Sequence, residues 1–501
     1  MDDVVYRTSL RTWTLNWRMI AAFGFVAGLV LASVAFRLSW DRFLDPFEDG
    51  YQNWWTASAL LETGTYSDRF SQMTRGNWLP GYTFFAAGLI ALFGIHIMPL
   101  MKAANILFSL GTTGIIYLLA RPRGRLTAGL AAILFVLNPA DIVISSFATP
   151  EALALLATFC GVLFVERRPF ASKTSLTFAA VAFLAASTLR YEVWGFVGLY
   201  LLLTWTGKRI KGRELLLLVG PATVFAAAWW IWTSQYGFLP SMIINQTSTD
   251  VRFKASAGTL APLADRLVYF FSWYFWWAPF AVIAIVWALF KERKSVFTWI
   301  LLMFYGAEVL YTAAGFGNPG PRYIHLAIPI VCINAAVSLV AVGTWVSRTK
   351  IRLRMTGRWA PLVAAVAVSL LLSVQVSNPS PEPGFFLSGT QRAGEFLATL
   401  PLPEGKLLIS ESPIAAYYSG YPASRILGSS NLPMDASNAS AFLVDHAAYV
   451  VMVTVPYNRI RVLFPDQANG VNSNHFVLLY DATGLEYDYG APRVLVFKIV
   501  P

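Results

Sequence analysis

The sequence predicts an α-helical polytopic membrane protein with about eleven spans, followed by a small C-terminal α/β domain. Composition is the first reason: of 501 residues, 56% are hydrophobic and 13% are charged, and the mean hydropathy is +0.55. The second is that the apolar residues form long runs, such as LNWRMIAAFGFVAGLVLASVAF and RYIHLAIPIVCINAAVSLVAVG. Each run is long enough to cross a hydrocarbon core of about 30 Å as a helix.

The first apolar run follows basic residues and ends near LASVAF, a pattern that a cleaved signal peptide and an uncleaved signal anchor share. We expect an uncleaved anchor, because the acidic loop that follows needs a helix to hold it at the membrane surface.

Basic loops predict the topology, because Lys and Arg are retained on the cytoplasmic side of a membrane. The basic loops are the N-terminus and residues 121–125, 166–173, 207–214, 291–294 and 347–358. All six can be cytoplasmic only if residues 81–94 do not cross. That segment is short, as expected of an interfacial or re-entrant helix.

The expected spans are residues 19–38, 99–120, 126–145, 150–166, 174–190, 192–206, 214–233, 267–290, 296–314, 321–346 and 359–377. This arrangement predicts a multi-pass protein of the cell (plasma) membrane with a cytoplasmic N-terminus and an extracytoplasmic C-terminus.

Two domains are expected. Residues 1–377 would form the membrane domain, whose first outer loop, residues 39–98, carries interfacial helices. A proline-rich linker, SNPSPEPG, then leads into an extracytoplasmic α/β domain, residues 378–501. In this domain KLLISES, AYVVMVTV and RVLVFKIV have strand patterns, whereas GTQRAGEFLATL and PIAAYYSG have helical ones.

Several functional classes are disfavoured. The net charge of +11 comes mostly from short loops, which argues against a nucleic-acid partner. Cys160 and Cys332 both lie in apolar runs, so neither a disulfide framework nor a zinc site is expected. Because no metal-ligand spacing and no phosphate-binding glycine loop occur, we expect no metal-binding residues, no cofactor and no nucleotide-sugar donor, whereas the sequence leaves metal dependence open.

An acidic pair follows the first expected span. Glu48 and Asp49 lie in DPFEDGYQNWW, next to the membrane, where an unpaired carboxylate is costly. Such a carboxylate could be a general base that takes a proton from an acceptor hydroxyl. Alternatively, the two acids are solvated loop residues or cap a helix. Gly50 is expected to allow a sharp turn into that helix, and Tyr51 to pack beside acceptor or lipid.

A resemblance to a known family favours the catalytic alternative. The segments EDGY, ASALLETGTYS and NWLPGYTFFAAGLIALFG, and then ANILFSLGTTGIIYLLARPRGRLTAGLAAILFVLNPADIVISSFATPEALALL, follow one another. In this order they resemble the protein O-mannosyltransferase and aminoarabinose transferase superfamily of C-type membrane glycosyltransferases. The resemblance covers most of residues 1–210 and returns at GPRYIHLAIPI, residues 320–330.

The resemblance implies a C-type glycosyltransferase fold and a polyprenyl-phosphate-linked sugar donor. It also implies that the acid after the first helix activates the acceptor, which maps to Asp49 or Glu48. The family has Asp followed by Glu or Asp, whereas this chain has Glu and then Asp. Both residues therefore stay candidates, and we prefer Asp49, directly before Gly50.

A lipid phosphate needs cations at the outer face of the membrane. Arg75 and Arg190 lie near positions where the family carries basic residues, and Arg322 with Tyr323 matches a recurrent Arg-Tyr pair. We expect the three arginines to converge on one outer cleft and bind the donor with Tyr323 and Tyr51. Each arginine alone could instead be an interfacial anchor.

Other ionisable residues are weaker candidates. Asp141 and Glu151 flank an expected outer turn, Glu308 lies inside a span, and His325 fits a packed or interfacial histidine better than a ligand. Glu192 is expected to pair with Arg190.

The predicted function is therefore an enzyme that transfers a sugar from a polyprenyl-phosphate donor to a lipid, glycan or protein acceptor at the extracytoplasmic face. The alternative is a transporter or flippase of lipid-linked or polar solutes, which should show polar residues in the middle of several spans or two similar halves. A non-catalytic scaffold is the third possibility.

Overall fold

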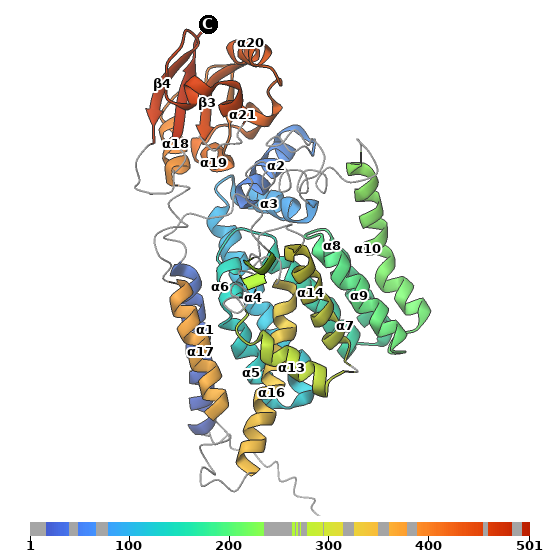
Figure 1. Cartoon of the computed structure of the whole chain (residues 1–501). Coiled ribbons are helices and arrows are strands. Elements are labelled where there is room, and N and C mark those ends of the chain that lie inside the picture. The colour runs from blue at the N-terminus through green and yellow to red at the C-terminus, as the bar shows by residue number, and fades with distance from the viewer. Residues whose placement is uncertain are drawn as a thin grey trace, which may run out of the picture.

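A computed structural model describes residues 17–39, 49–66, 79–234, 263–265, 267–268, 271, 278–293, 295–313, 325–348, 360–377, 388–453, 459–482 and 493–501. Figure 1 shows a bundle of long helices, two shorter helices that lie across one end of it, and a mixed α/β part beyond them. The bundle helices are α1 (Trp17–Ser39), α4 (Met98–Ala120), α5 (Arg125–Val136), α6 (Pro139–Ser145), α7 (Glu151–Arg167), α8 (Ser172–Ser187), α9 (Glu192–Thr206), α10 (Gly212–Thr233), α13 (Ala281–Lys291), α14 (Val296–Ala313), α16 (Ile328–Arg348) and α17 (Ala360–Ser377).

Three of the described helices are long and apolar enough to cross a membrane by themselves: Met98–Arg123, Gly212–Thr233 and His325–Trp345. Most expected spans coincide with a helix to within a few residues, and residues 192–206 are α9 itself. Several of these helices are shorter than a full crossing requires on length alone. The number of about eleven spans therefore stays a prediction.

The expected single span at residues 126–145 is wrong in one respect, because it is broken. Helices α5 and α6 meet at an angle of 54°. Pro139 is the first residue of α6, and the Asn138 side chain accepts hydrogen bonds from the N–H groups of Ala140 and Asp141, at 3.0 and 3.3 Å. Asn138 and Pro139 thus start a new helix where apolar character alone predicted continuity.

Neighbouring helices satisfy the carbonyls that this break leaves unpaired. The Ser33 hydroxyl of α1 donates to the carbonyl of Val136 at 2.6 Å, and the Ser373 hydroxyl of α17 donates to that of Leu137 at 2.7 Å. In a hydrocarbon environment a broken helix is tolerated only when such partners exist. The first and last bundle helices, which lie side by side in Figure 1, therefore stabilise the bend together.

The expected span at residues 267–290 also differs from the structure. Helix α13 begins at Ala281, after a turn at residues 278–280 that the Ala281 N–H closes on the Ala278 carbonyl at 2.9 Å. Pro279 lies in this turn and has no N–H for a helical hydrogen bond, so it is not part of a regular helix that continues into α13.

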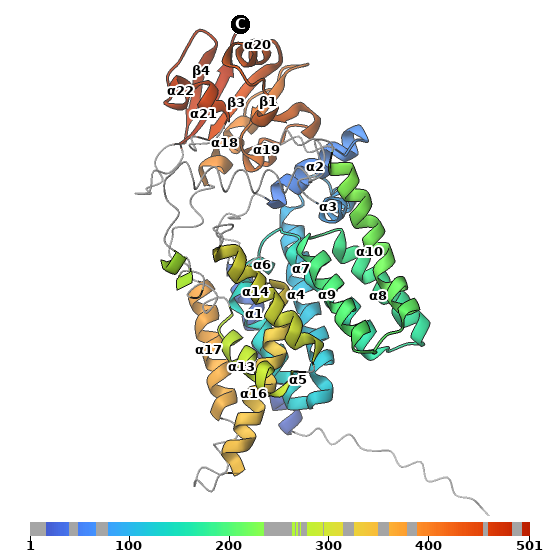
Figure 2. The same cartoon turned by 45° about the vertical axis from the view of Figure 1, so that its right-hand side comes forward.

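Helices α2 (Asp49–Thr63) and α3 (Pro80–Phe93) pack on each other and lie across the end of the bundle, between it and the sheet (Figures 1 and 2). Helix α3 is the segment expected not to cross the membrane. Its first turn is fixed to the α8–α9 link, because the Gly81 N–H donates to the Thr188 carbonyl at 2.8 Å.

The C-terminal part contains a five-stranded sheet of order β2-β1-β3-β5-β4. Strands β1, β2 and β3 are parallel, and β5 is antiparallel to both β3 and β4. Its elements are α18 (Ser388–Ala398), β1 (Leu407–Ser410), α19 (Pro413–Ser419), β2 (Ile426–Gly428), α20 (Ala436–His446), β3 (Ala447–Val453), α21 (Arg459–Leu463), α22 (Pro465–Ala468), β4 (Phe476–Asp481) and β5 (Val494–Ile499), with short 3₁₀ turns η5 (Ala423–Arg425) and η6 (Ser429–Asn431).

Alternate residues of the central strands face opposite layers, as strand geometry requires. Val451 and Val496 belong to the core shared with α18, α19 and α2, whereas Val450 and Leu495 belong to a second core with α20. The strands predicted from KLLISES, AYVVMVTV and RVLVFKIV are confirmed as β1, β3 and β5. The short strand β2 and the partly exposed β4 were not predicted.

Candidate functional site

Asp49 is the first residue of α2 and is 8% exposed. The Asn53 side-chain amide donates to the Asp49 carbonyl at 2.8 Å, and the Thr83 hydroxyl of α3 donates to the Asn53 side-chain oxygen, also at 2.8 Å. The first turn of α2 is therefore fixed to α3. A carboxylate at this position also interacts favourably with the positive end of the helix dipole.

Gly50 brings α2 against the α6–α7 link, residues 146–150. A Cβ atom at Gly50 would lie 2.5 Å from the Ala148 carbonyl oxygen and 2.8 Å from the Ala148 Cβ. Among the described residues, Gly50 is not one of the glycines with positive φ. The expectation of a sharp turn at Gly50 is thus wrong, because the residue allows close approach of two backbones within a helix.

The α6–α7 link is itself held by a buried side chain of α4. The Asn105 amide nitrogen donates to the carbonyls of Phe147 and Thr149, at 2.6 and 2.7 Å, and lies 3.2 Å from the Tyr82 hydroxyl of α3. Asn105 is fully buried. One amide therefore connects α3, α4 and the link against which α2 packs.

Arg190, in the α8–α9 link, lies between two carboxylates. Its guanidinium is 3.0 Å from Glu151 at the start of α7 and 2.6 Å from Glu192 at the start of α9. The Arg190 and Glu151 side chains are 12% and 2% exposed, whereas Glu192 is 26% exposed. The predicted Arg190–Glu192 pair is confirmed, and Glu151 is a second partner that the sequence had not indicated.

The ends of α2, α3, α7 and α9 therefore meet at the end of the bundle nearest the sheet. The α6–α7 link contacts Gly50 and leads directly into Glu151, and the α8–α9 link carries Arg190 and contacts Gly81. Four predicted site residues, Glu48, Arg75, Arg322 and Tyr323, lie outside the described residues. The convergence of the three arginines thus stays a prediction.

Tyr51 is 2% exposed and contacts the C-terminal part of the chain. Its ring lies 5.4 Å from that of Tyr417 in an edge-on arrangement, and Trp54 contacts the same ring at 4.9 Å. Burial raises the pKa of the Tyr417 phenol to about 12. Tyr51 therefore has packing partners within the chain, and its role in substrate binding stays a prediction.

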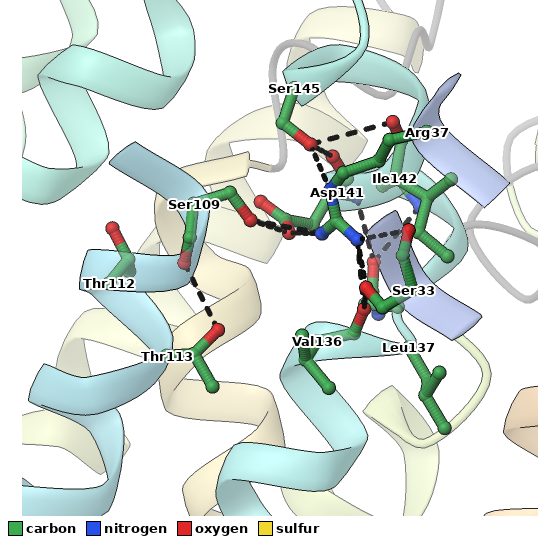
Figure 3. A network of polar contacts seen from close by, with 12 residues as sticks. Ser33, Arg37, Ser109, Thr112, Thr113, Val136, Leu137, Asp141, Ile142 and Ser145 are labelled. Carbon is green, nitrogen blue, oxygen red and sulfur yellow. Dashed lines mark hydrogen bonds and ion pairs between the residues drawn. The ribbon is translucent and has the colours of Figure 1, made fainter. Parts of the chain in front are cut away.

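A buried polar network lies deeper in the bundle, and Figure 3 shows it from close by. Arg37 of α1 lies 2.5 Å from Asp141 of α6, and both side chains are 0% exposed. The Ser109 hydroxyl of α4 donates to the same Asp141 oxygen at 2.5 Å, and His325 Nε2 lies 3.2 Å from the other oxygen. Three helices and the 3₁₀ turn η3 (His325–Ala327) thus meet at Asp141.

Arg37 also binds neutral partners. Its Nε donates to the Ser145 hydroxyl at 2.7 Å, and its Nη1 donates to the Ser33 hydroxyl and to the carbonyl of Val136, the latter at 3.2 Å. His325 is confirmed as a packed histidine, at 2% exposure. The sequence analysis did not identify Arg37 as a candidate. A cation near the end of an apolar run nevertheless indicates that it has a buried partner.

No family model and no curated protein matches the sequence. Solved structures do match the fold. One is ArnT from Cupriavidus metallidurans in the apo state, with 15% identity, a TM-score of 0.59 and coverage of 95% of this chain and 98% of that one. The same protein bound to undecaprenyl phosphate matches with 16% identity, a TM-score of 0.60 and the same coverage.

A third match is the archaeal oligosaccharyltransferase AglB from Archaeoglobus fulgidus in complex with an inhibitory peptide and a dolichol-phosphate. It has 10% identity and a TM-score of 0.55, and the match covers 89% of this chain and 71% of that one. At such identities the likeness shows the fold. The chain therefore has the fold of the C-type membrane glycosyltransferases ArnT and AglB, as the resemblance of residues 1–210 predicted.

Proposed function

We propose that this chain is a glycosyltransferase that moves a sugar from a polyprenyl-phosphate-linked donor to an acceptor at the extracytoplasmic face of the plasma membrane. The observation that carries the proposal is the mostly buried Asp49 at the start of α2, packed beside the α6–α7 link. The shared fold supports it, because ArnT has been captured with undecaprenyl phosphate and AglB with a dolichol-phosphate.

The chemistry needs one base and a leaving group. Asp49 would take the proton of an acceptor hydroxyl while the oxygen attacks the anomeric carbon. The bond from that carbon to the phosphate oxygen breaks in the same step, and polyprenyl phosphate leaves with the electron pair. A carboxylate in a largely water-excluded site is suited to this task, because its interactions are weakly screened there. Glu48 is the alternative base.

The donor phosphate would be bound by Arg75, Arg190 and Arg322, with Tyr323 beside them. Arg190 is already paired with Glu151 and Glu192, so a phosphate would compete with a carboxylate for the guanidinium. We expect it to replace Glu192, because that side chain is 26% exposed whereas Glu151 is 2% exposed. Arg190 would then keep Glu151 as the anchor that orients its guanidinium.

The C-terminal part would help to enclose this site. We propose that residues 1–377 form the catalytic membrane domain and residues 378–501 an extracytoplasmic domain that covers α2. The aromatic contacts of Tyr417 with Tyr51 and Trp54 support this arrangement. So does the Glu62 carboxylate of α2, which accepts hydrogen bonds from the N–H groups of Ala423 and Ser424 at 3.0 and 2.7 Å.

A transfer assay tests the proposal. Purified full-length protein in detergent is incubated with a panel of radiolabelled polyprenyl-phosphate sugars and with membrane lipids as acceptors. We expect label to move to an acceptor while an equal amount of free polyprenyl phosphate is released. Movement of intact labelled donor across a proteoliposome membrane, without transfer in any assay, would instead indicate a flippase.

The buried network does not favour the transporter alternative. A transport pathway needs polar groups that face a cavity, but Arg37, Asp141 and His325 are at most 2% exposed and bind one another.

A further inference from the structure

A second site lies at the opposite end of the bundle from Asp49. Helix α2, which begins with Asp49, contacts the chain just before the first residue of α4, since the Trp54 indole donates to the Ile95 carbonyl at 2.9 Å. The 3₁₀ turn η2 (Arg121–Arg123) follows the other end of α4. Because α4 has 23 residues, the two ends are roughly 35 Å apart at 1.5 Å per residue.

A cavity of about 730 Å³ opens at this end. Residues from η2, the end of α7, the α9–α10 link and the α13–α14 link line it. These segments belong to four of the six basic loops that were expected to be cytoplasmic. The structure thus brings together loops that are up to about 170 residues apart in the chain, as the 169-residue separation of Arg123 and Glu292 shows.

The cavity is strongly basic. Its cations are Arg123, Arg167, Arg209, Lys291 and Arg293. Two carboxylates share the lining, which leaves an excess of three positive charges. In membrane proteins, basic pockets between helix ends are typical binding sites for anionic lipid headgroups.

The carboxylates compensate only part of this charge. Glu292 lies 3.1 Å from Arg123, and Glu166 lies 3.6 Å from Arg209. Within the described part of the chain, Arg167, Lys291 and Arg293 have no carboxylate partner. Arg167 donates to the Leu119 carbonyl at 2.5 Å, so Lys291 and Arg293 at the rim of the cavity are the cations most available to an anion.

An apolar cavity of about 490 Å³ adjoins the basic one and shares Pro122 and Arg167 with it. Leu118, Leu163 and Pro169 line this second cavity. A charged compartment beside an apolar one suits an amphiphile, whose phosphate would lie among the arginines and whose chain would lie along α4 and α7. A soluble anion has no apolar group that could fill the apolar cavity.

We propose that these two cavities form a binding site for an anionic phospholipid of the surrounding leaflet. Arginine forks match phosphate oxygens, and the η2 turn between the cavities offers Arg121 and Arg123 to a headgroup. Such a lipid would connect the ends of α4, α7 and α13 and stabilise the bundle. The inference does not depend on the proposed function, because the site lies far from Asp49.

The test uses the full-length protein, delipidated in detergent micelles. Its thermal unfolding midpoint is measured by tryptophan fluorescence while phosphatidylglycerol is titrated. Parallel titrations use phosphatidylcholine and inorganic phosphate. We expect phosphatidylglycerol to raise the midpoint in a saturable way, phosphatidylcholine to have no such effect, and inorganic phosphate to be much weaker, because binding to the folded state alone stabilises it.

Matched variants locate the site. Lys291→Gln with Arg293→Gln removes one Lys and one Arg from the rim, and should weaken phosphatidylglycerol binding about 25-fold, at about fivefold per charge. Lys173→Gln with Arg213→Gln removes the same two residue types from exposed positions at this end that line neither cavity, and should change binding less than about twofold. Glu292→Gln should strengthen binding about fivefold, because it removes a negative charge from the cavity.

Three results would overturn the proposal. Equal losses in the two double variants would mean that phosphatidylglycerol responds only to net charge. Equal stabilisation by inorganic phosphate would identify a soluble phosphate ligand. No stabilisation of the wild type by phosphatidylglycerol would mean that the cavity binds no anionic lipid.

Discussion

The Arg37 guanidinium and the Asp141 carboxylate lie 2.5 Å apart with no exposure, although 104 residues separate them in the chain. Taking two charges out of water is costly unless each finds further hydrogen bonds. Arg37 obtains them from three serine hydroxyls and two carbonyls, and Asp141 obtains them from Ser109 and His325. The pair therefore joins α1 to the broken α5–α6 segment.

Replacing one partner of this pair should destabilise the protein more than replacing both. Arg37→Met leaves the Asp141 carboxylate buried without its main cation, at a cost of roughly 3–5 kcal/mol. Arg37→Met with Asp141→Asn should recover much of that loss. The thermal unfolding midpoint of purified protein measures both, with Lys173→Met as a control at an exposed position. An Arg37→Met protein as stable as this control would mean that the network contributes little.

Much of the bundle could be predicted from the sequence because each helix carries its own local signal. The apolar run of α9 is bounded by Arg190 and by Gly207, and its predicted bounds are those of the structure. The break at Asn138 was also locally visible, since Asn followed by Pro is typical of a helix start. Continuous hydrophobicity on both sides outweighed that signal.

The candidate site was less predictable, because its contacts link distant segments. Nothing near Arg37 indicates Asp141, and nothing near Gly50 indicates that its partner is Ala148. Glu151 could be recognised as an acid at a helix start, but its pairing with Arg190 depends on how two helix links pack. Family resemblance pointed to Asp49, whereas only the packing shows how α2 is held.

Gly50→Ala should disturb the candidate site by steric overlap. The new Cβ would lie 2.5 Å from a backbone oxygen of the α6–α7 link, so α2 must move. Overpacking of this kind typically costs about 1–3 kcal/mol, and transfer activity should fall with it. Gly88→Ala in α3 is the matched control, because nothing lies within 4 Å of its Cβ position. Equal effects of the two changes would contradict the close contact at Gly50.

Glu62 should control how the C-terminal part docks on α2. Glu62→Ala removes both acceptors of the Ala423 and Ser424 N–H groups. We expect amide hydrogen exchange at these two positions to become roughly tenfold faster. This corresponds to the lower end of the free-energy range for hydrogen bonds to charged groups, which applies because Glu62 is exposed. In the part of the chain that the structure describes, the Thr63 hydroxyl bonds only to the Ala59 carbonyl and the Thr65 N–H, so Thr63→Ala should leave the exchange unchanged. Unchanged exchange in Glu62→Ala would show that aromatic packing alone holds the two parts together.

Arg190 should combine a structural and a binding role. Arg190→Gln removes the cation from the nearly buried Glu151, which should lower the unfolding midpoint, and adding Glu151→Gln should restore it. Affinity for polyprenyl phosphate should be lost in both variants, whereas Glu192→Gln should keep or increase it. These affinities can be measured by equilibrium binding of a fluorescent polyprenyl phosphate. Wild-type affinity in the Arg190→Gln, Glu151→Gln double variant would limit Arg190 to positioning the α8–α9 link.

The catalytic base can be identified by measuring donor binding and turnover separately in variants of the two carboxylates. A carboxylate that takes a proton only as the transition state forms should affect kcat and leave donor binding nearly unchanged. Asp49→Asn should therefore lower turnover about 10²–10⁴-fold, the usual contribution of a general base, with donor affinity close to that of the wild type. Glu48→Gln should have the smaller effect. Single-turnover kinetics and donor binding measure the two quantities separately, and the unfolding midpoint controls for any change at the start of α2.

Full activity in Asp49→Asn together with loss in Glu48→Gln would move the role of base to Glu48. Full activity in the double variant would exclude both carboxylates as the base, and with them the acid–base mechanism proposed for this site.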